Sequence, residues 1–237
     1  MEDGRDNMQA LHILYEDNHM IVVEKPVNVP SQSDKTGDRD LLTIVKQYLK
    51  EKYQKPGNVY LGLIHRLDRP VGGVMVFAKT SKAAARLSEE IRNKTFQKEY
   101  LVITDGKWDK PEGILEDYLW KNERKNMSFV TKEDQKNAKY AKLAYQVLKY
   151  DEKTNLSVLK IHLYTGRHHQ IRVQLASRGH SIYGDQKYGT RGSGKQINLW
   201  AYRVILTHPV RKEKMSFQVL PQKVGSWKAL EGINLED

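Results

Sequence analysis

The chain has 237 residues, of which 39% are hydrophobic and 29% charged, a balance typical of folded globular proteins. It contains no cysteine, which excludes disulfides, thiolate catalysis and cysteine-based zinc or iron–sulfur sites, and fits a reducing cytoplasm. Lys and Arg number 40 against 29 Asp and Glu, so the net charge is +11. Such a basic chain is typical of nucleic-acid-binding proteins, although a generally basic surface would give the same totals.

The first residues are acidic and polar, without the basic start and apolar segment of a signal peptide. No apolar run approaches the ~20 residues that cross a bilayer. We therefore expect a cytoplasmic protein without a membrane partner. The length fits one domain over 1–237, and nothing in the sequence demands more than a monomer.

In the first half of the chain, short β-prone runs alternate with segments of helical spacing. In chain order the pattern predicts strands over 11–15 and 20–24, a helix over 41–53, strands over 61–64 and 73–78, a helix over 81–95, and a strand over 98–103. Pro26 and Pro30 end the first ladder, because proline cannot donate a backbone hydrogen bond. Ser81 is the expected cap of the second helix.

The second half begins with a hydrophilic, lysine-rich stretch over 121–149. Beyond it the pattern predicts strands over 140–149 and 156–163 about a turn, a loop running into a helix over 165–178, and strands over 199–206 and 215–219. Strands and helices without regular alternation favour an α+β fold around a central, mostly antiparallel or mixed sheet.

Three segments carry residues that could perform chemistry. Asp68 lies in HRLDRPVGG, flanked by two arginines before a glycine turn, where an ionised carboxylate acts as nucleophile, base or metal ligand, or simply pins a turn. Tyr100 in KEYLV is either a site aromatic or an ordinary strand residue. GRHHQIR over 166–172 is either a phosphate-attracting helix start or a solvated basic face. On a helix, the adjacent His168 and His169 would point away from each other.

The sequence gives little support for a metal or a cofactor. Six of the histidines lack any ligand spacing such as H-E-x-x-H: His65, His162, His168, His169, His180 and His208. No phosphate-binding loop or dinucleotide fingerprint is present. We expect neither a metal site nor a bound cofactor.

Four motifs in order resemble those of the RluA-type pseudouridine synthases. HRLD at 65–68 with the following glycines resembles the catalytic motif HRLD-x-x-T-S-G, and KEY at 98–100 resembles K-x-Y. GRHHQIRV at 166–173 resembles G-R-T-H-Q-I-R-V, and 179–189 follows G-H-P-I-x-G-D-x-x-Y-G. The resemblance extends over about 11–221.

The resemblance implies the pseudouridine synthase fold, with a catalytic cleft along the sheet, and isomerisation of uridine in RNA to pseudouridine without cofactor or metal. It implies that Asp68 is the nucleophile, which attacks the ribose C1′ or assists its deprotonation pathway. Tyr100 would stack on the base and help to remove the C5 proton, and Arg172, rather than Arg167, would pair with Asp68. The residues expected to bind RNA or substrate are His65, Arg66, Leu67, Arg69, Arg167, His169 and Gln170.

Two departures from the family pattern, Val71-Gly72-Gly73 and His168, leave the target site open between ribosomal and transfer RNA. No room is expected for the N-terminal RNA-binding S4 domain of many relatives. We also expect the lysine-rich segment 121–142 to be a mobile hairpin that grips RNA. The alternatives are a non-catalytic RNA-binding module, whose signature would be loss of Asp68 or Tyr100, and a metal-dependent nuclease using Asp and His.

Overall fold

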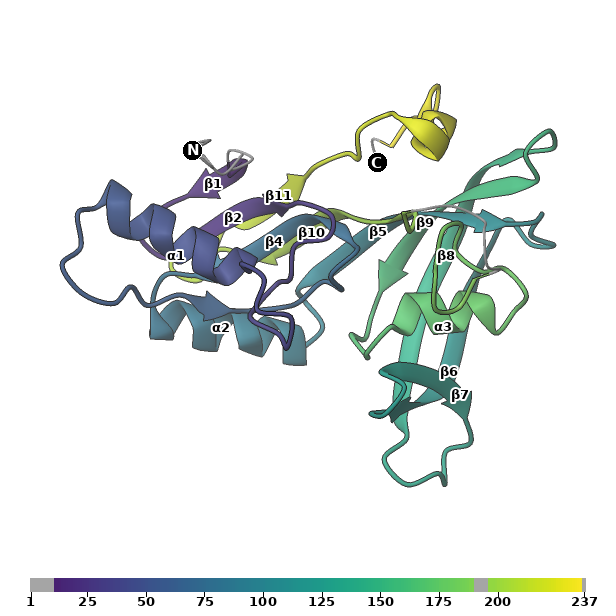
Figure 1. The fold of residues 1–237 in the computed structure, drawn as a ribbon, viewed down its shortest axis with the longest axis horizontal. Coiled ribbons are helices and arrows are strands. Elements are labelled where there is room, and N and C mark those ends of the chain that lie inside the picture. Colours follow the sequence, from purple (N-terminus) through teal and green to yellow (C-terminus); the bar gives the residue numbers. More distant parts are fainter. Residues whose placement is uncertain (1–10, 190–195, 236–237) are drawn as a thin grey trace, which may run out of the picture.

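The computed structural model describes residues 11–189 and 196–235, which form one large sheet with helices against it (Figure 1). The helices are α1 (Leu41–Lys52), α2 (Ser81–Arg92), α3 (Gln170–Ala176) and the short 3-10 helix η1 (Gly225–Leu230). None of the described helices is long and apolar enough to cross a membrane.

Eleven strands make up the sheet: β1 (Ile13–Glu16), β2 (Met20–Lys25), β3 (Gly62–Leu63), β4 (Gly72–Ala78), β5 (Gln97–Asp105), β6 (Glu112–Asn122), β7 (Met127–Thr131), β8 (Lys139–Asp151), β9 (Leu156–Leu163), β10 (Leu199–Thr207) and β11 (Lys214–Gln218). Their order is β1-β2-β4-β10-β5-β9-β8-β6-β7, with β3 beside β4 and β11 beside β10. The pairings are antiparallel except β4 with β10, which is parallel. The predicted α+β fold with a mostly antiparallel, mixed sheet is therefore confirmed.

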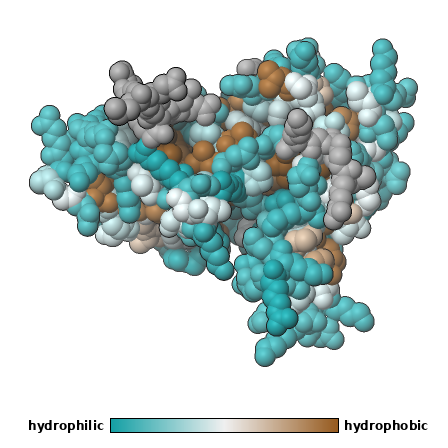
Figure 2. Space-filling model, in the orientation of Figure 1, coloured by the Kyte–Doolittle hydropathy of each residue, from teal (hydrophilic) through white to brown (hydrophobic). Residues whose placement is uncertain are grey.

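The sheet carries its helices in two groups. Figure 1 shows α1 and α2 beside the half that contains β2 and β4, and α3 beside the half that contains β8 and β6. The β6–β7 hairpin projects away from the rest of the molecule (Figure 1), and mainly hydrophilic side chains cover it in Figure 2. Asp68 lies on the loop before β4, in the first half of the sheet, and Arg172 lies on α3, beside the second half. The hydrogen bond between these two residues therefore connects the two halves.

Most predicted elements are present, but three details differ. Strands β6 and β7 were not predicted, because only Leu115 and Leu119 of β6 are buried and the alternation is weak. The side chain that caps α2 is Thr80, which accepts a hydrogen bond from the Ala83 amide at 3.1 Å, and not Ser81. The loop predicted to run into a helix over 165–178 is present, but α3 already ends at Ala176.

The start of β4 can pair with β10 because it consists of two glycines. A Cβ on Gly72 would collide with the ring of Trp200, and one on Gly73 would collide with the backbone of Ala201. Gly73 also has a φ of +123°, a conformation that side chains disfavour. The Asp68 carbonyl accepts the Val71 amide at 2.9 Å just ahead of these glycines. The close approach of β4 to β10 therefore fixes the loop that carries Asp68.

We expect Gly73→Ala to lower the free energy of unfolding by about 2 kcal/mol or more, through backbone strain and collision with β10. Urea unfolding followed by circular dichroism measures this. Gly57→Ala is the matched control, because its added Cβ meets open space and its φ is ordinary; it should change stability by less than about 0.5 kcal/mol. Equal stabilities for the two variants would contradict the role of the β4–β10 contact.

Candidate active site

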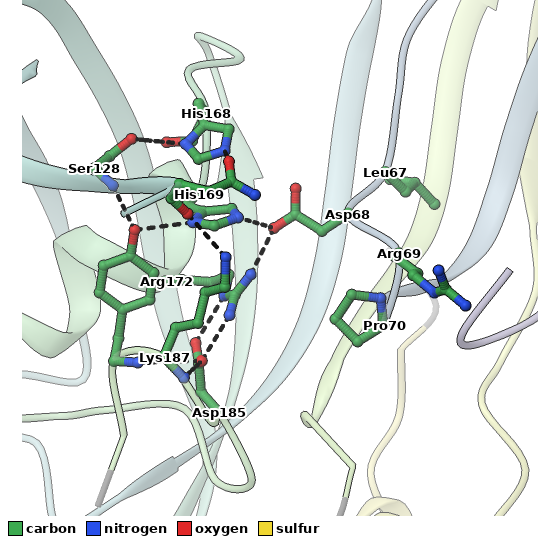
Figure 3. Close-up of polar contacts among 12 residues, drawn as sticks. Leu67, Asp68, Arg69, Pro70, Ser128, His168, His169, Arg172, Asp185 and Lys187 are labelled. Atoms are coloured by element: carbon green, nitrogen blue, oxygen red, sulfur yellow. Dashed lines mark hydrogen bonds and ion pairs between the residues drawn. The ribbon is translucent and has the colours of Figure 1, made fainter. Parts of the chain in front are cut away.

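Asp68 is presented by a loop whose neighbouring residue is locked into the core. The Leu67 amide donates to the Ser31 hydroxyl at 3.1 Å, and that hydroxyl donates to the Leu67 carbonyl at 2.8 Å. The Leu67 side chain is buried, whereas the Asp68 side chain keeps 29% of its surface exposed. The loop therefore turns one carboxylate out of the core and toward α3 (Figure 3).

The carboxylate of Asp68 meets a guanidinium that is itself held by a second carboxylate. Nη1 of Arg172 donates to Oδ2 of Asp68 at 3.0 Å. On its other edge, Arg172 binds Asp185 in a bidentate pair, with Nε–Oδ2 and Nη2–Oδ1 distances of 2.8 and 2.7 Å. The side chains of Arg172 and Asp185 are 5% and 0% exposed. Since a bidentate pair fixes the plane of the guanidinium, Asp185 determines where Arg172 holds Asp68.

Arg172 and Asp185 remain charged although both are buried. Burial alone would raise the pKa of Asp185, but its hydrogen bonds to Arg172 outweigh that effect and lower it. Burial likewise opposes the charge on Arg172, and its pKa is nevertheless raised because Asp185 and Asp68 stabilise the cation. Asp185 was not predicted as a site residue; its only signal was its place in the motif over 179–189.

His169 lies beside Arg172, near the same oxygen of Asp68, and is uncharged at neutral pH. Its Nε2 lies 3.6 Å from Oδ2 of Asp68, and its Nδ1 lies 2.9 Å from the hydroxyl of Tyr188. Burial lowers the pKa of His169 to about 3, although the charge of Asp68 works in the opposite direction. The contact with Asp68 is therefore that of a neutral ring and a carboxylate, rather than an ion pair.

The rings of His168 and His169 stack, with centroids 3.8 Å apart and an angle of 27° between their planes. The prediction that they point apart is wrong, because both residues precede α3 and His169 has a left-handed backbone with φ of 52°. The ring of His168 also contacts the turn of the β6–β7 hairpin, because its Nε2 lies 3.1 Å from Oδ1 of Asn126.

Further hydrogen bonds join the β6–β7 hairpin to this side of the site (Figure 3). The Ser128 amide donates to the Tyr188 hydroxyl at 2.6 Å, and the Ser128 hydroxyl donates to the His168 carbonyl at 2.7 Å. Nζ of Lys187 donates to the Asn126 carbonyl at 2.8 Å. The hairpin is thus linked to Asp68 by three successive contacts, through Tyr188 and His169.

A small cavity of about 90 Å³ lies between Asp68 and Tyr100. Tyr100 is buried on β5, and burial together with the charge of Asp68 raises the pKa of its hydroxyl, which therefore stays protonated. Leu163, Val71 and Leu199 supply apolar walls. The dimensions and the aromatic wall suit one planar ring close to the carboxylate.

The small cavity adjoins a groove of about 1360 Å³, because several residues line both. The cationic side chains along this groove come from five parts of the chain: Arg66, Arg69, Arg92, Lys94, Lys98, Lys121, Arg167, Arg172 and Lys187. A long basic groove leading to a ring-sized cavity is an arrangement that accepts a polyanion with one planar group inserted.

The remaining residues predicted from sequence fall into two groups. Arg66 and Arg167 are exposed and line both cavities, as a contact with RNA would require. Arg69 points away from Asp68 (Figure 3) and pairs with Asp34, at 3.8 Å, and with Asp38. The cation that neutralises Asp68 is therefore Arg172 and not a flanking arginine.

His65 and Gln170 lie deeper than the exposed arginines. Nε2 of His65 accepts the Val76 amide at 3.1 Å, which ties the ring to β4. The side-chain amide of Gln170 makes four hydrogen bonds within the protein, to Thr165, Arg167, Lys142 and Gln174. Because these hydrogen bonds lie within the protein, the side-chain amide of Gln170 stabilises the loop before α3.

Residues 19–177 match the family described as RNA pseudouridylate synthase. The chain is 32% identical over 222 residues to an uncharacterized RNA pseudouridine synthase of Aquifex aeolicus, covering 88% of this chain and 69% of that protein. It is 30% identical over 213 residues to the ribosomal large subunit pseudouridine synthase C of Haemophilus influenzae, covering 86% of this chain and 63% of that one. The chain thus spans about two thirds of the length of these relatives.

Among solved structures, the fold is similar to that of human RNA pseudouridylate synthase domain containing 4, with a TM-score of 0.74, 23% identity and 89% of each chain covered. The corresponding human domain containing 1 gives a TM-score of 0.73 at 23% identity, over 96% of this chain and 89% of that one. This likeness in fold agrees with the family that the motifs indicated. The chain belongs to the RNA pseudouridylate synthase family, as its RluA-type motifs indicated.

Proposed function

We propose that this protein isomerises uridine in RNA to pseudouridine, with Asp68 as the nucleophile. The observation that carries the proposal is the asymmetric environment of the Asp68 carboxylate. Its Oδ2 is held by Arg172 and faced by His169, whereas the described residues form no hydrogen bond or ion pair with Oδ1. One oxygen anchors the group while the other remains available to a substrate in the adjoining cavity.

The reaction needs an extruded uridine, because the bond between N1 and C1′ is inaccessible in a stacked helix. The cavity beside Asp68 would receive the uracil against Tyr100, and the basic groove would hold the flanking phosphates. Asp68 attacks C1′ or assists deprotonation of the sugar. The uracil then detaches, turns, and rejoins the sugar through C5. The proton leaves C5 near Tyr100, so the product differs from the substrate only in its glycosidic bond.

We further propose ribosomal RNA as the substrate, in preference to transfer RNA. The relatives from Haemophilus influenzae and Nitrosomonas europaea are named ribosomal large subunit pseudouridine synthases C and D. The basic groove has the volume and charge for a structured RNA rather than a free nucleoside. We propose that the protein acts as a cytoplasmic monomer, consistent with a site built from one chain.

Asp68→Asn should abolish release of tritium from RNA labelled at uridine C5, because an amide cannot replace the carboxylate nucleophile. The assay uses total cellular RNA with excess chelator, and sequencing of the treated RNA locates the product in ribosomal or transfer RNA. Release by the native protein alone establishes the reaction. RNA binding without release from either protein would favour a non-catalytic binding module.

Asp185→Asn should lower kcat by about 100-fold with little change in KM for RNA, because Arg172 would lose its bidentate anchor and shift Asp68. The substitution should also cost about 3 kcal/mol of stability, since it removes one partner of a buried ion pair. Single-turnover kinetics and urea unfolding measure the two effects. Asp109→Asn, which changes an exposed carboxylate, is the control and should alter neither.

The same ion pair sets the response of stability to acid. The pKa of Asp185 is lowered in the folded protein, so this carboxylate stabilises the fold above its unfolded pKa of about 3.9. That stabilisation disappears as the pH falls through the lower, folded pKa. Below about pH 4, the free energy of unfolding should therefore fall less steeply for Asp185→Asn than for the native protein. Parallel pH curves would contradict this assignment.

The lysine-rich segment 121–142, which includes β7 and the loop between β7 and β8, offers a separate test of RNA binding. Substituting Lys125, Lys132 and Lys136 with Glu should weaken binding of RNA by about tenfold or more and reduce its dependence on salt. Fluorescence anisotropy at several salt concentrations measures both. The matched control carries the same change in net charge at three exposed lysines elsewhere, Lys82, Lys110 and Lys228. A smaller or equal loss in the hairpin variant would contradict a role in gripping RNA.

A further inference from the structure

Three buried cations surround the Asp68 loop, and two of them have their hydrogen bonds satisfied inside the protein. Nζ of Lys25 donates to the carbonyls of Pro26, Val29 and Arg69 at 2.9, 2.6 and 3.0 Å. Arg172 is enclosed by two carboxylates. These two cations therefore have structural partners that account for their burial.

The third cation, Lys98, has no such partners. It lies on β5 with 9% of its surface exposed, two residues before Tyr100 and on the same face of the strand. Among the residues that the structure describes, none forms a hydrogen bond or ion pair with its ammonium group. Burial lowers the pKa of Lys98, and no nearby carboxylate offsets this. The ammonium faces the site, because it lines both cavities and a Cβ on Gly166 would lie 3.3 Å from Nζ.

A second unsatisfied donor lines the same two cavities. Because Nε2 of His65 accepts the Val76 amide, the neutral ring carries its proton on Nδ1. Nδ1 is buried and has no partner among the described residues. Burial and the charge of Lys98 together lower the pKa of His65 to about 3, which places the two groups within electrostatic range of each other. A buried donor without an acceptor, beside an unpaired ammonium that lines the same cavities, indicates that the missing acceptor comes from a ligand.

The character of the pocket favours an anionic ligand. A neutral carbonyl would satisfy one hydrogen bond but would leave the buried charge of Lys98 uncompensated. Exposed cations continue from Lys98 along the groove at Arg66, Arg92 and Lys94. Along the strand, two residues correspond to about 7 Å, so Lys98 lies about one nucleotide's reach from the aromatic face of Tyr100.

We propose that Lys98, assisted by Nδ1 of His65, binds a phosphate group adjoining the uridine that enters the cavity. This inference rests on the proposed function and adds to it the group that positions the nucleotide. Lys98 is thereby a substrate-binding residue, and its role is distinct from that of the phosphate contacts made in the outer groove. The ammonium remains unpaired in the free protein so that the substrate can supply its counter-ion.

The test compares binding of uridine, 3′-UMP and 5′-UMP to the native protein and to Lys98→Met by titration calorimetry. The native protein should bind one of the two nucleotides about 10-fold to 100-fold more tightly than uridine, the range expected for a hydrogen bond to a charged group. In Lys98→Met this difference should disappear while binding of uridine is unchanged. Lys82→Met, which removes an exposed lysine on α2, should retain the difference.

Stability separates a ligand-binding role from a structural one. Methionine resembles lysine in length and has no charge, so Lys98→Met should leave the melting temperature unchanged or raise it. Gly166→Ala provides a second variant, because its Cβ crowds Nζ and should weaken nucleotide binding while uridine still binds.

Three outcomes would overturn the proposal. The first is that the native protein binds uridine and both nucleotides equally. The second is that Lys98→Met loses uridine and nucleotide binding equally, which would indicate a contact with the base, and the third is that this substitution markedly destabilises the protein. The binding assay needs no turnover, so its result is independent of the isomerase assay. Phosphate-dependent binding without tritium release would contradict the proposed reaction and leave the anion site in place.

Discussion

The site depends on the placement of one guanidinium between two carboxylates. Arg172 reaches Asp68 from α3, and its orientation is fixed by Asp185, which is fully buried and also accepts the amides of Lys187 and Tyr188. Because a charge so deeply buried is tolerated only with its partners in place, the trio cannot adopt many arrangements. Asp68 is thereby held at one oxygen, and the loop, α3 and the segment after it behave as a single unit.

Two constraints from the sheet bring that unit together. Gly72 and Gly73 allow β4 to approach β10, and this contact fixes the position of the Asp68 loop, which directly precedes β4. At the other end, β7 contributes Ser128, whose amide binds the hydroxyl of Tyr188. The β6–β7 hairpin, which is part of the segment proposed to contact RNA, is consequently hydrogen-bonded to the groups that surround Asp68.

The buried cations illustrate the difference between a structural and a binding group. Lys25 is surrounded by carbonyls and holds the Asp68 loop through the carbonyl of Arg69, while Lys98 faces a cavity without an acceptor. Burial of the Lys98 side chain lowers the pKa of its ammonium group, and no described residue pairs with that group. An unpaired charge of this kind is typical of sites that are completed only when the substrate binds.

The sequence by itself determined the family, the α+β class and three central side chains, because the motifs around Asp68, Tyr100 and Arg172 are local and their spacing is distinctive. Alternation located strands such as 140–149, where every second residue from Ala141 to Tyr145 is buried. It missed β6 and β7, whose exposed faces weaken that pattern.

Only the tertiary structure decided which groups meet. Asp68 and Arg172 are 104 residues apart, and the anchoring role of Asp185 depends on how the segment after α3 folds back. His168 and His169 stack because the helix begins after them, a boundary that the sequence did not define. The unpaired state of Lys98 is likewise invisible in sequence, since a missing partner is a property of three-dimensional surroundings and not of local spacing.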